Sequence, residues 1–341
     1  MNLTRIGRNL SFLASVLRMQ LITERPIFLS HMITSVCNCR CATCDYWKLG
    51  KLREMTTQEI FQMLEEARQL GMTDYVVWGG EPLLRTDLSK ILSHANNLGM
   101  DCTVITNGWL LPQQIRGIAD DLWGVMVSID HPEAEVHDRL RGISGVYNRA
   151  IEGVKLAREF EDLRVLINCV IQKENVRRID EMVALAQDLD VQLTLEMMEV
   201  IEGYNEHLLP SREEIERASR RLIQMKRAGL PISNSVSYFK SLAAQTPYSC
   251  QVPKVLVTVC WDGEVRVCST ISESARPVPA DFRLGNVTQL GLGKIFRSEA
   301  YEMYMHSARE CCKCDTSYPR EIALIDRRDR EAVWNLLTSI L

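Results

Sequence analysis

Six short apolar segments alternate with amphipathic segments between residue 28 and about residue 200, and this rhythm strongly constrains the fold. The apolar segments are rich in β-branched residues, as strands buried on both faces are. They span residues 28–36, 75–78, 102–105, 124–129, 164–171 and 192–197. Helices are predicted between them, at 57–70, 87–97, 150–160 and 179–189, where apolar residues recur three and four positions apart. Six βα units predict an α/β fold, a partial (β/α)6 TIM-like barrel with its chemistry at the carboxyl ends of the strands.

The rhythm ends after residue 200, which predicts a second, smaller unit. A charged amphipathic helix is expected at 212–227 and a hairpin at 254–268, where Asp262 and Gly263 give a strong turn signal. Shorter helices are expected at 292–305 and 327–341. Five parts are predicted: an amphipathic helix at 1–27, the barrel at 28–205, a helical linker at 206–245, a small β-hairpin and helix domain at 246–320, and a terminal helix at 321–341.

Twelve cysteines and a near-neutral charge limit the function classes. The formal net charge of −4 argues against a nucleic-acid binder, and no apolar run is long enough to span a bilayer. No secretory signal is recognised at the N-terminus, so a cytoplasmic location is expected. Most of the cysteines fall into two groups, which favours metal or redox chemistry over disulfides.

The first cysteine group directly follows the first predicted strand. Cys37, Cys41 and Cys44 have the spacing C-x3-C-x2-C, and Cys39 lies between them. Three thiolates on one loop can bind three irons of a 4Fe–4S cluster and leave the fourth iron open for a ligand. Structural zinc is the alternative, although such sites usually use C-x2-C pairs and a fourth ligand.

These cysteines and the strand ends that follow them resemble the radical SAM superfamily, whose members bind S-adenosylmethionine (SAM) on such a cluster. The resemblance covers roughly residues 28–200 and implies which side chains contact SAM. The implied residues are Gly79, Gly80, Glu81, Pro82, Thr106, Asn107, Ser128, Asp130 and Arg141. The segment 137–142 resembles one that is common in members with an auxiliary cluster. Independently, two glycines at a strand end allow a ligand to approach the backbone closely.

The chain departs from the superfamily pattern just before the third cysteine. An aromatic residue is usual there, and this chain has Thr43. Tyr46 or Trp47 could supply the adenine contact instead. Cys39 is an additional cysteine, and the complete motif around it favours a role other than cluster ligand.

The second cysteine group lies before, within and after the predicted hairpin. Its candidate ligands are Cys250, Cys268, Cys311 and Cys314, with Cys260 and Cys312 as alternatives. The pattern resembles the twitch domain, a shortened SPASM domain that binds one auxiliary 4Fe–4S cluster through four cysteines. A zinc site with four cysteine ligands is the alternative, because zinc favours C-x2-C pairs. Cys102 and Cys169 fall within strands and are expected to be small buried apolar residues.

The resemblance implies that the chain cleaves SAM reductively to a 5′-deoxyadenosyl radical, which abstracts a hydrogen atom from a substrate. The auxiliary cluster favours a net oxidation of a small metabolite, such as a dehydrogenation or an oxidative bond formation. An external electron donor such as flavodoxin or ferredoxin is implied. No catalytic acid or base is assigned, and a non-enzymatic electron carrier or zinc protein is the competing class.

Peptides and lipids or isoprenoids remain open as substrates. The lipid alternative comes from an apolar stripe at residues 2–22, flanked by Arg5, Arg8 and Arg18, which is typical of helices that lie on anionic membranes. Packing of this helix against the barrel is favoured over peripheral membrane contact.

Overall fold

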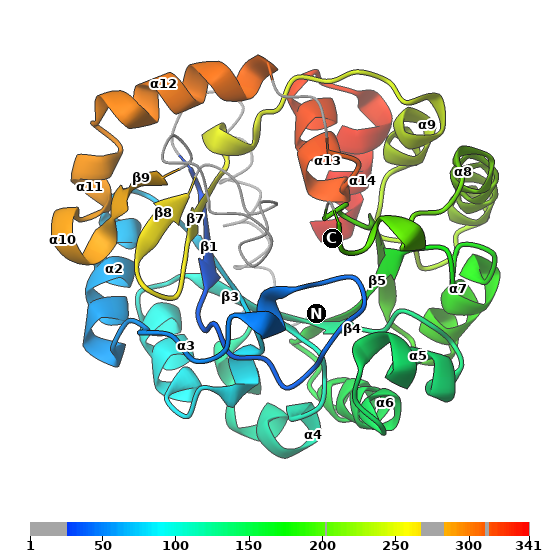
Figure 1. Ribbon diagram of the computed structural model, residues 1–341, viewed down its shortest axis with the longest axis horizontal. Coiled ribbons are helices and arrows are strands. Elements are labelled where there is room, and N and C mark those ends of the chain that lie inside the picture. The colour runs from blue at the N-terminus through cyan, green and yellow to red at the C-terminus, as the bar shows by residue number, and fades with distance from the viewer. Residues whose placement is uncertain (1–25, 202, 267–282, 311–313, 341) are drawn as a thin grey trace.

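One mixed sheet of nine strands runs through the computed structural model, which describes residues 26–201, 203–266, 283–310 and 314–340. The strand order is β6-β5-β4-β3-β2-β1-β7-β8-β9 (Figure 1). The strands are β1 Phe28–Met32, β2 Asp74–Trp78, β3 Asp101–Thr106, β4 Gly124–Ser128, β5 Arg164–Ile171, β6 Gln192–Met197, β7 Leu256–Val259, β8 Glu264–Arg266 and β9 Arg283–Asn286. Neighbours from β6 through β7 are parallel, whereas β7, β8 and β9 pair antiparallel.

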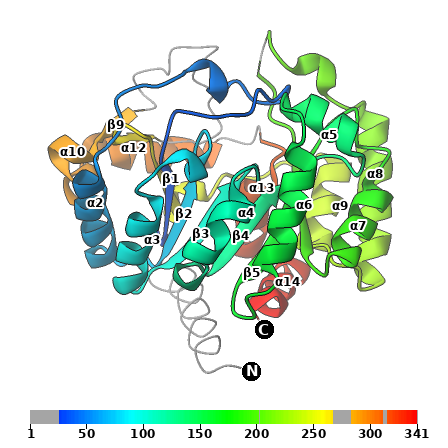
Figure 2. The same cartoon turned by 90° about the horizontal axis from the view of Figure 1, so that it is seen from below.

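Helices surround this sheet (Figures 1 and 2). They are α2 Thr57–Gln69, α3 Leu88–Asn97, α4 Leu111–Gln114, α5 Ala134–Arg141, α6 Val146–Ala157, α7 Ile179–Asp188, α8 Arg212–Arg227, α9 Val236–Ala244, α10 Val287–Leu290, α11 Leu292–Ile295, α12 Glu299–Ser307, α13 Ser317–Asp326 and α14 Arg330–Ile340. None of these helices has the length and hydropathy that a membrane-spanning helix requires. The predicted helix at 2–22 lies outside the described residues.

Burial alternates along the central strands and separates two faces of the sheet. Val104 and Ile167 are fully buried and share the main hydrophobic core with Val154 of α6. Their neighbours Ile105 and Asn168 point to the opposite face and are half-buried. The inner face is therefore less completely buried than the filled interior of a full TIM barrel. The predicted fold class, a partial barrel with a C-terminal addition, is confirmed.

Most predicted elements agree with the structure, and the differences have local causes. The predicted strands 164–171 and 192–197 and the helix 212–227 have the predicted bounds. The first strand ends at Met32 rather than at residue 36, because Thr34 and Ser35 turn away and donate to the carboxylate of Glu54. Thr56 caps α2 and forms a capping box with Glu59.

The C-terminal part differs more from the prediction. The hairpin of β7 and β8 turns at Gly263 as expected, but it extends the barrel sheet through parallel pairing of β7 with β1. The single helix expected at 292–305 is two helices, α11 and α12, because the chain turns between Ile295 and Ser298. Helices α5 and α13 are not among the predicted elements, and α9 falls within the predicted helical linker 206–245.

Candidate active site

The loop after β1 carries four cysteines at the end of the barrel where the parallel strands terminate (Figure 2). Cys39 and Cys41 are buried together, and Cys37 and Cys44 pack against them. The thiol of Cys39 hydrogen-bonds to the thiols of Cys37 and Cys41. The hydrogen bond with Cys39, aided by the nearby charge of Arg141, lowers the pKa of the Cys41 thiol to about 7. The loop thus gathers thiols, one of which is readily deprotonated near neutral pH.

The segment after β2 packs its backbone directly against this loop. The N–H groups of Gly80 and Glu81 donate to the carbonyls of Thr34 and Val36, each at 2.8 Å. A Cβ atom on Gly80 would lie 2.1 Å from the carbonyl oxygen of Val36 and 3.0 Å from the nitrogen of Cys37. Only glycine fits at this contact without displacing the cysteine loop.

The C-terminal end of α5 contacts the other side of the loop. The N–H groups of Arg40 and Ala42 donate to the carbonyls of Arg141 and Leu140, both at 2.9 Å. Gly142 follows in the left-handed region at φ 65° and ends the helix. The cysteine loop is therefore hydrogen-bonded on two sides by backbone groups from distant segments.

Glu81 connects the segment after β2 to the end of β3. Its carboxylate is buried and accepts hydrogen bonds from the hydroxyl of Thr106 at 2.6 Å and the N–H of Asn107 at 2.8 Å. The side-chain amide of Asn107 in turn donates to Oδ1 of Asn38 at 2.7 Å, within the cysteine loop. Nδ2 of Asn38 is buried and has no hydrogen-bond partner. One donor beside Cys37 is therefore available for an acceptor on a ligand.

Asp130 and Arg141 form a buried ion pair behind the cysteines. Nε of Arg141 lies 2.8 Å from Oδ2 of Asp130, and Nη1 of Arg141 lies 3.9 Å from Sγ of Cys41. Asp130 also accepts from the N–H of Val170 at 3.0 Å. His137 accepts from the backbone N–H of Asp130, and burial lowers the pKa of His137 to about 2. The neutral histidine therefore orients Asp130, while Arg141 places positive charge beside a thiol.

Four half-buried side chains come from three segments: Tyr46 follows the cysteine loop, Trp78 ends β2, and Glu196 and Glu199 lie at the end of β6 and just beyond it. We call these four side chains the inner patch. The rings of Tyr46 and Trp78 meet edge to face at 6.3 Å. Burial raises the pKa of Glu196 to about 7, and burial together with Glu196 raises that of Glu199 to about 8. Burial also raises the pKa of Tyr46, to which the nearby Glu199 contributes. All four side chains keep partial exposure, so the patch combines low polarity with accessibility.

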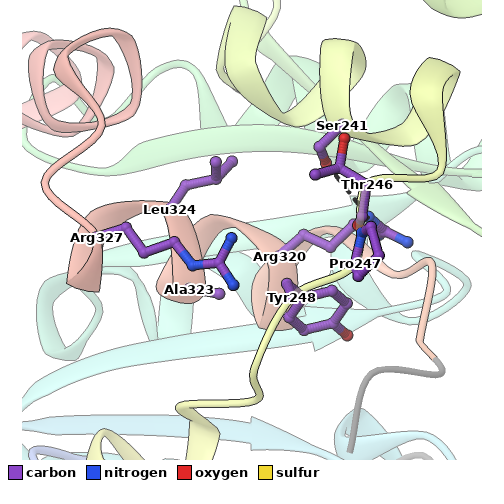
Figure 3. A pocket seen from close by; sticks show the side chains of 8 residues that line it. All are labelled: Ser241, Thr246, Pro247, Tyr248, Arg320, Ala323, Leu324 and Arg327. Carbon is purple, nitrogen blue, oxygen red and sulfur yellow. Dashed lines mark hydrogen bonds between the residues drawn. The ribbon is translucent and has the colours of Figure 1, made fainter.

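The described part of the second cysteine group lies beside α13. The hydroxyl of Tyr248 and Nε of Arg320 both donate to the carbonyl of Cys314, at 3.0 and 3.2 Å. The guanidinium of Arg320 lies 4.9 Å from the ring centre of Tyr248. Figure 3 shows these two side chains together at the edge of a small pocket. The segment that leads to Cys250 is thus tied to the segment that carries Cys314, whereas Cys268, Cys311 and Cys312 lie outside the described residues.

Comparison with known families decides the identity of this arrangement. Residues 32–186 match the Radical SAM superfamily, and residues 250–315 match the iron–sulfur cluster-binding domain SPASM. The first range contains the three-cysteine motif, and the second contains all four cysteines of the other group. The chain belongs to the radical SAM superfamily.

The curated relatives of this radical SAM protein are named for different reactions. An AdoMet-dependent heme synthase of Methanosarcina barkeri is 30% identical over 172 residues, 49% of each chain. A PqqA peptide cyclase of Bradyrhizobium diazoefficiens is 29% identical over 171 residues, 48% of this chain and 44% of the relative. The chain thus aligns with about half the length of these curated relatives.

Solved structures show the same fold over most of the chain. Streptococcus suis SuiB bound to S-adenosylmethionine superposes with a TM-score of 0.68 at 15% identity, covering 85% of this chain and 70% of SuiB. The protein anSMEcpe with bound AdoMet superposes with a TM-score of 0.67 at 16% identity, covering 92% and 98%. At this identity the likeness concerns the fold.

The cysteine loop of the radical SAM protein suits a 4Fe–4S cluster by its donor chemistry. Its donors are thiols, and the unpartnered amide of Asn38 adds a hydrogen-bond donor beside Cys37. Within the described residues, no three His, Cys, Asp or Glu side chains are arranged around a single metal ion. A cubane offers a separate iron to each thiolate, so its ligands need not converge on one point. The residues present therefore fit a cluster better than a lone zinc ion.

The structure refines several residue roles predicted from the sequence. Glu81 is implied as a SAM contact by the resemblance, and its carboxylate already accepts hydrogen bonds from the hydroxyl of Thr106 and the N–H groups of Asn107 and Leu83. Arg141 is also implied as a SAM contact, and in the structure it pairs with Asp130. Ser128 lies at the end of β4, and Pro82 starts a short 3-10 helix. Contacts of these residues with SAM remain predictions.

Some predicted cysteine roles are also clarified. Cys102 and Cys169 are buried in the main core, as expected for small apolar residues. Cys260 packs with Met32 and Trp261 in a separate buried cluster. No disulfide joins the described cysteines.

Replacing Gly80 by alanine should release the first cluster. The new Cβ would overlap the carbonyl of Val36, so the cysteine loop must shift. We expect iron and sulfide at the first site to fall at least about twofold after anaerobic reconstitution. Gly117→Ala is the matched control, because nothing lies within 4 Å of a Cβ built there. Equal loading of Gly80→Ala and the wild type would contradict the prediction.

Proposed function

We propose that this chain is a radical SAM oxidoreductase acting on a small organic substrate beside its cysteine loop. When bound by Cys37, Cys41 and Cys44, a 4Fe–4S cluster supplies the electron that splits SAM into methionine and a 5′-deoxyadenosyl radical, which takes a hydrogen atom from the substrate. The observation that supports this most strongly is the meeting of the three-cysteine loop with the segments after β2, β3 and β4 at one end of the sheet.

The chain's own residues bind and orient SAM in this proposal. The backbone at Gly79 and Gly80 provides a surface that a ligand can approach closely. Thr106, Asn107 and Ser128 provide hydrogen-bonding groups at strand ends. Asp130, Arg141 and Pro82 complete the predicted contacts. The buried carboxylate of Glu81, just after β2, accepts hydrogen bonds from Thr106 and Asn107 at the end of β3 and so holds these two strand ends together.

The second cysteine group supports assignment of a net oxidation. A second 4Fe–4S cluster on Cys250, Cys268, Cys311 and Cys314 supplies an electron-transfer centre. The hydrogen bonds from Tyr248 and Arg320 hold the carbonyl of Cys314 in place for such a centre. An external reductant such as flavodoxin or ferredoxin completes the electron supply.

The inner patch provides the chemistry that would select a substrate. Its aromatic side, Tyr46 and Trp78, packs against apolar groups, and the carboxyl group of Glu199 accepts or donates hydrogen bonds. The carboxylate of Glu196 is already bonded to the N–H and the hydroxyl of Ser317. This combination favours a compact molecule with both an apolar face and hydroxyl or amino groups. A peptide is the second candidate, because one relative is a peptide cyclase and SuiB has been solved with its precursor peptide.

SAM cleavage by the anaerobically reconstituted protein tests the function directly. Wild type reduced with dithionite should bind SAM saturably and form methionine and 5′-deoxyadenosine in equal amounts. Stimulation of that turnover by cyclitols and sugars, rather than by short peptides, would favour the small-metabolite assignment. A fully loaded protein that neither binds nor cleaves SAM would instead indicate an electron carrier or a zinc protein.

The stability of the loaded protein should fall with rising pH because of Glu199. Its pKa rises from the ordinary 4.5 to about 8 on folding, so the folded chain binds the additional proton between these values. Each increase of one pH unit within that window should therefore lower the free energy of unfolding by up to about 1.4 kcal/mol. Glu199→Gln copies the neutral carboxyl and should flatten the pH dependence in urea unfolding, whereas Glu161→Gln, on an exposed loop, should not. An unchanged slope in Glu199→Gln would contradict the prediction.

A further inference from the structure

The loop after β6 reaches the cysteine loop and hydrogen-bonds to its backbone. The hydroxyl of Tyr204 donates to the carbonyl of Cys41 at 2.9 Å and to that of Cys44 at 3.3 Å. The side-chain amide of Asn205 donates to the carbonyl of Thr43 at 3.0 Å. Two adjacent side chains thus bind three carbonyls of one four-residue turn.

Asn205 also ties this turn to its own loop. Its side chain is fully buried, at 0% exposure. Nδ2 donates a second hydrogen bond to the carbonyl of Glu199 at 2.8 Å, and Oδ1 accepts from the N–H of Ile201 at 2.7 Å. Truncating this amide would leave buried backbone groups on both loops without these partners, each at a cost of about 1–3 kcal/mol.

The ring of Tyr204 makes a further contact with the segment just beyond Cys44. Nζ of Lys48 lies 3.8 Å from the ring centre, within the range of a cation–π interaction. The hydroxyl and the ring therefore contact both ends of the segment 41–48. Removing the hydroxyl alone should leave the contact with Lys48 intact.

Besides the hydrogen bond from the N–H of Ala42 to the carbonyl of Leu140, the turn at residues 41–44 is held by the side chains of Tyr204 and Asn205. It lies outside the strands and helices, so its carbonyls need partners from side chains or solvent. The directions of the Cys41 and Cys44 thiols depend on the peptide planes that these carbonyls belong to. A cluster bound by three thiolates tolerates little change in those directions.

We propose that Tyr204 and Asn205 are positioning residues that hold the turn 41–44 in its cluster-binding conformation. The inference rests on the proposed function, since it assumes that Cys37, Cys41 and Cys44 bind the first cluster. It goes beyond that function by assigning cluster retention to the loop after β6. Because the same amide binds the carbonyl of Glu199, the cysteine loop and the inner patch are joined through one side chain.

The test compares Tyr204→Phe and Asn205→Ala with the wild type as full-length, anaerobically reconstituted proteins. The readouts are iron and sulfide content and the change that SAM produces in the EPR spectrum of the reduced protein, which reports on the open iron of the first cluster. Loss of an outer partner of a metal ligand typically costs about 10–100-fold in metal affinity, so we expect the SAM-responsive signal to fall at least about threefold. Asn205→Ala should have the larger effect because it removes two donors and one acceptor.

Two matched variants separate cluster positioning from general stability. Asn234 is also a buried asparagine, and its side-chain amide hydrogen-bonds to both the N–H and the carbonyl of Leu195. Tyr75 is a buried tyrosine whose hydroxyl hydrogen-bonds to His31. Asn234→Ala and Tyr75→Phe should keep the SAM-responsive signal even if they lower the melting temperature. If Asn205→Ala does not fold, as judged by circular dichroism, Tyr204→Phe decides the question alone.

The possible failures are distinguishable. A wild type that binds no cluster on its three cysteines would refute the proposed function. A wild type that binds the cluster and responds to SAM, with folded Tyr204 and Asn205 variants that behave identically, would refute the positioning role alone.

Discussion

Cys41→Ala is expected to abolish SAM cleavage while leaving the fold intact. Cys41 lies at the centre of the cysteine group, in contact with Cys39 and beside the guanidinium of Arg141. Removal of an outer partner of a metal ligand costs about 10–100-fold, so loss of a ligand itself should reduce 5′-deoxyadenosine formation at least about 100-fold. Product formation would be measured by liquid chromatography after reduction with dithionite, alongside iron content.

Cys39→Ala is the matched control, because it removes a neighbouring buried thiol from the same loop. Cys39 is 1% exposed and contacts Cys37 and Cys41, but it lies outside the C-x3-C-x2-C spacing. The variant should retain at least half of the wild-type iron and SAM cleavage. If Cys39→Ala were inactive and Cys41→Ala active, the ligand set would be misassigned and Cys39 would replace Cys41 in it.

The barrel could be predicted from the sequence because its signals are local. Strands such as β5 and β6 are short runs rich in β-branched residues. Helix α8 begins with a capping box formed by Ser211 and Glu214, which is recognisable from the sequence. The cysteine spacing and the strand-end segments were predictable for the same reason. Each signal lies within a few residues.

Other features depend on contacts between distant residues and could not be predicted. α13 has Pro319 at its third position. A proline in the sequence usually indicates the end of a helix, although it is tolerated in the first turn. The bonds from Tyr204 and Asn205 to the cysteine loop join positions about 160 residues apart. No motif marks them, because a tyrosine or asparagine in a loop is ordinary. The hydrogen bonds of Glu81 with Thr106 and Asn107 likewise join separate segments of the chain.

Asp130→Asn should destabilise the protein by about 3–5 kcal/mol, because it leaves the Arg141 guanidinium buried without its counter-ion. The side chains of Asp130 and Arg141 are 2% and 11% exposed, and their charged atoms lie 2.8 Å apart. Asparagine can still accept from the N–H of Val170, so the backbone bond to β5 need not be lost. The measurement is the free energy of unfolding in urea under anaerobic conditions.

A double-mutant cycle with Arg141→Met separates the ion pair from the rest of the site. Replacing both members of a buried pair by uncharged groups is often nearly neutral, whereas removing one leaves a buried charge. The double variant should therefore be more stable than Asp130→Asn alone. The EPR change that SAM produces should nevertheless be smaller in the double variant than in the wild type, because the double variant lacks Arg141, whose guanidinium lies 3.9 Å from the sulfur of Cys41. Additive effects of the two substitutions on stability would contradict the prediction, because they would show that the ion pair between Asp130 and Arg141 contributes little.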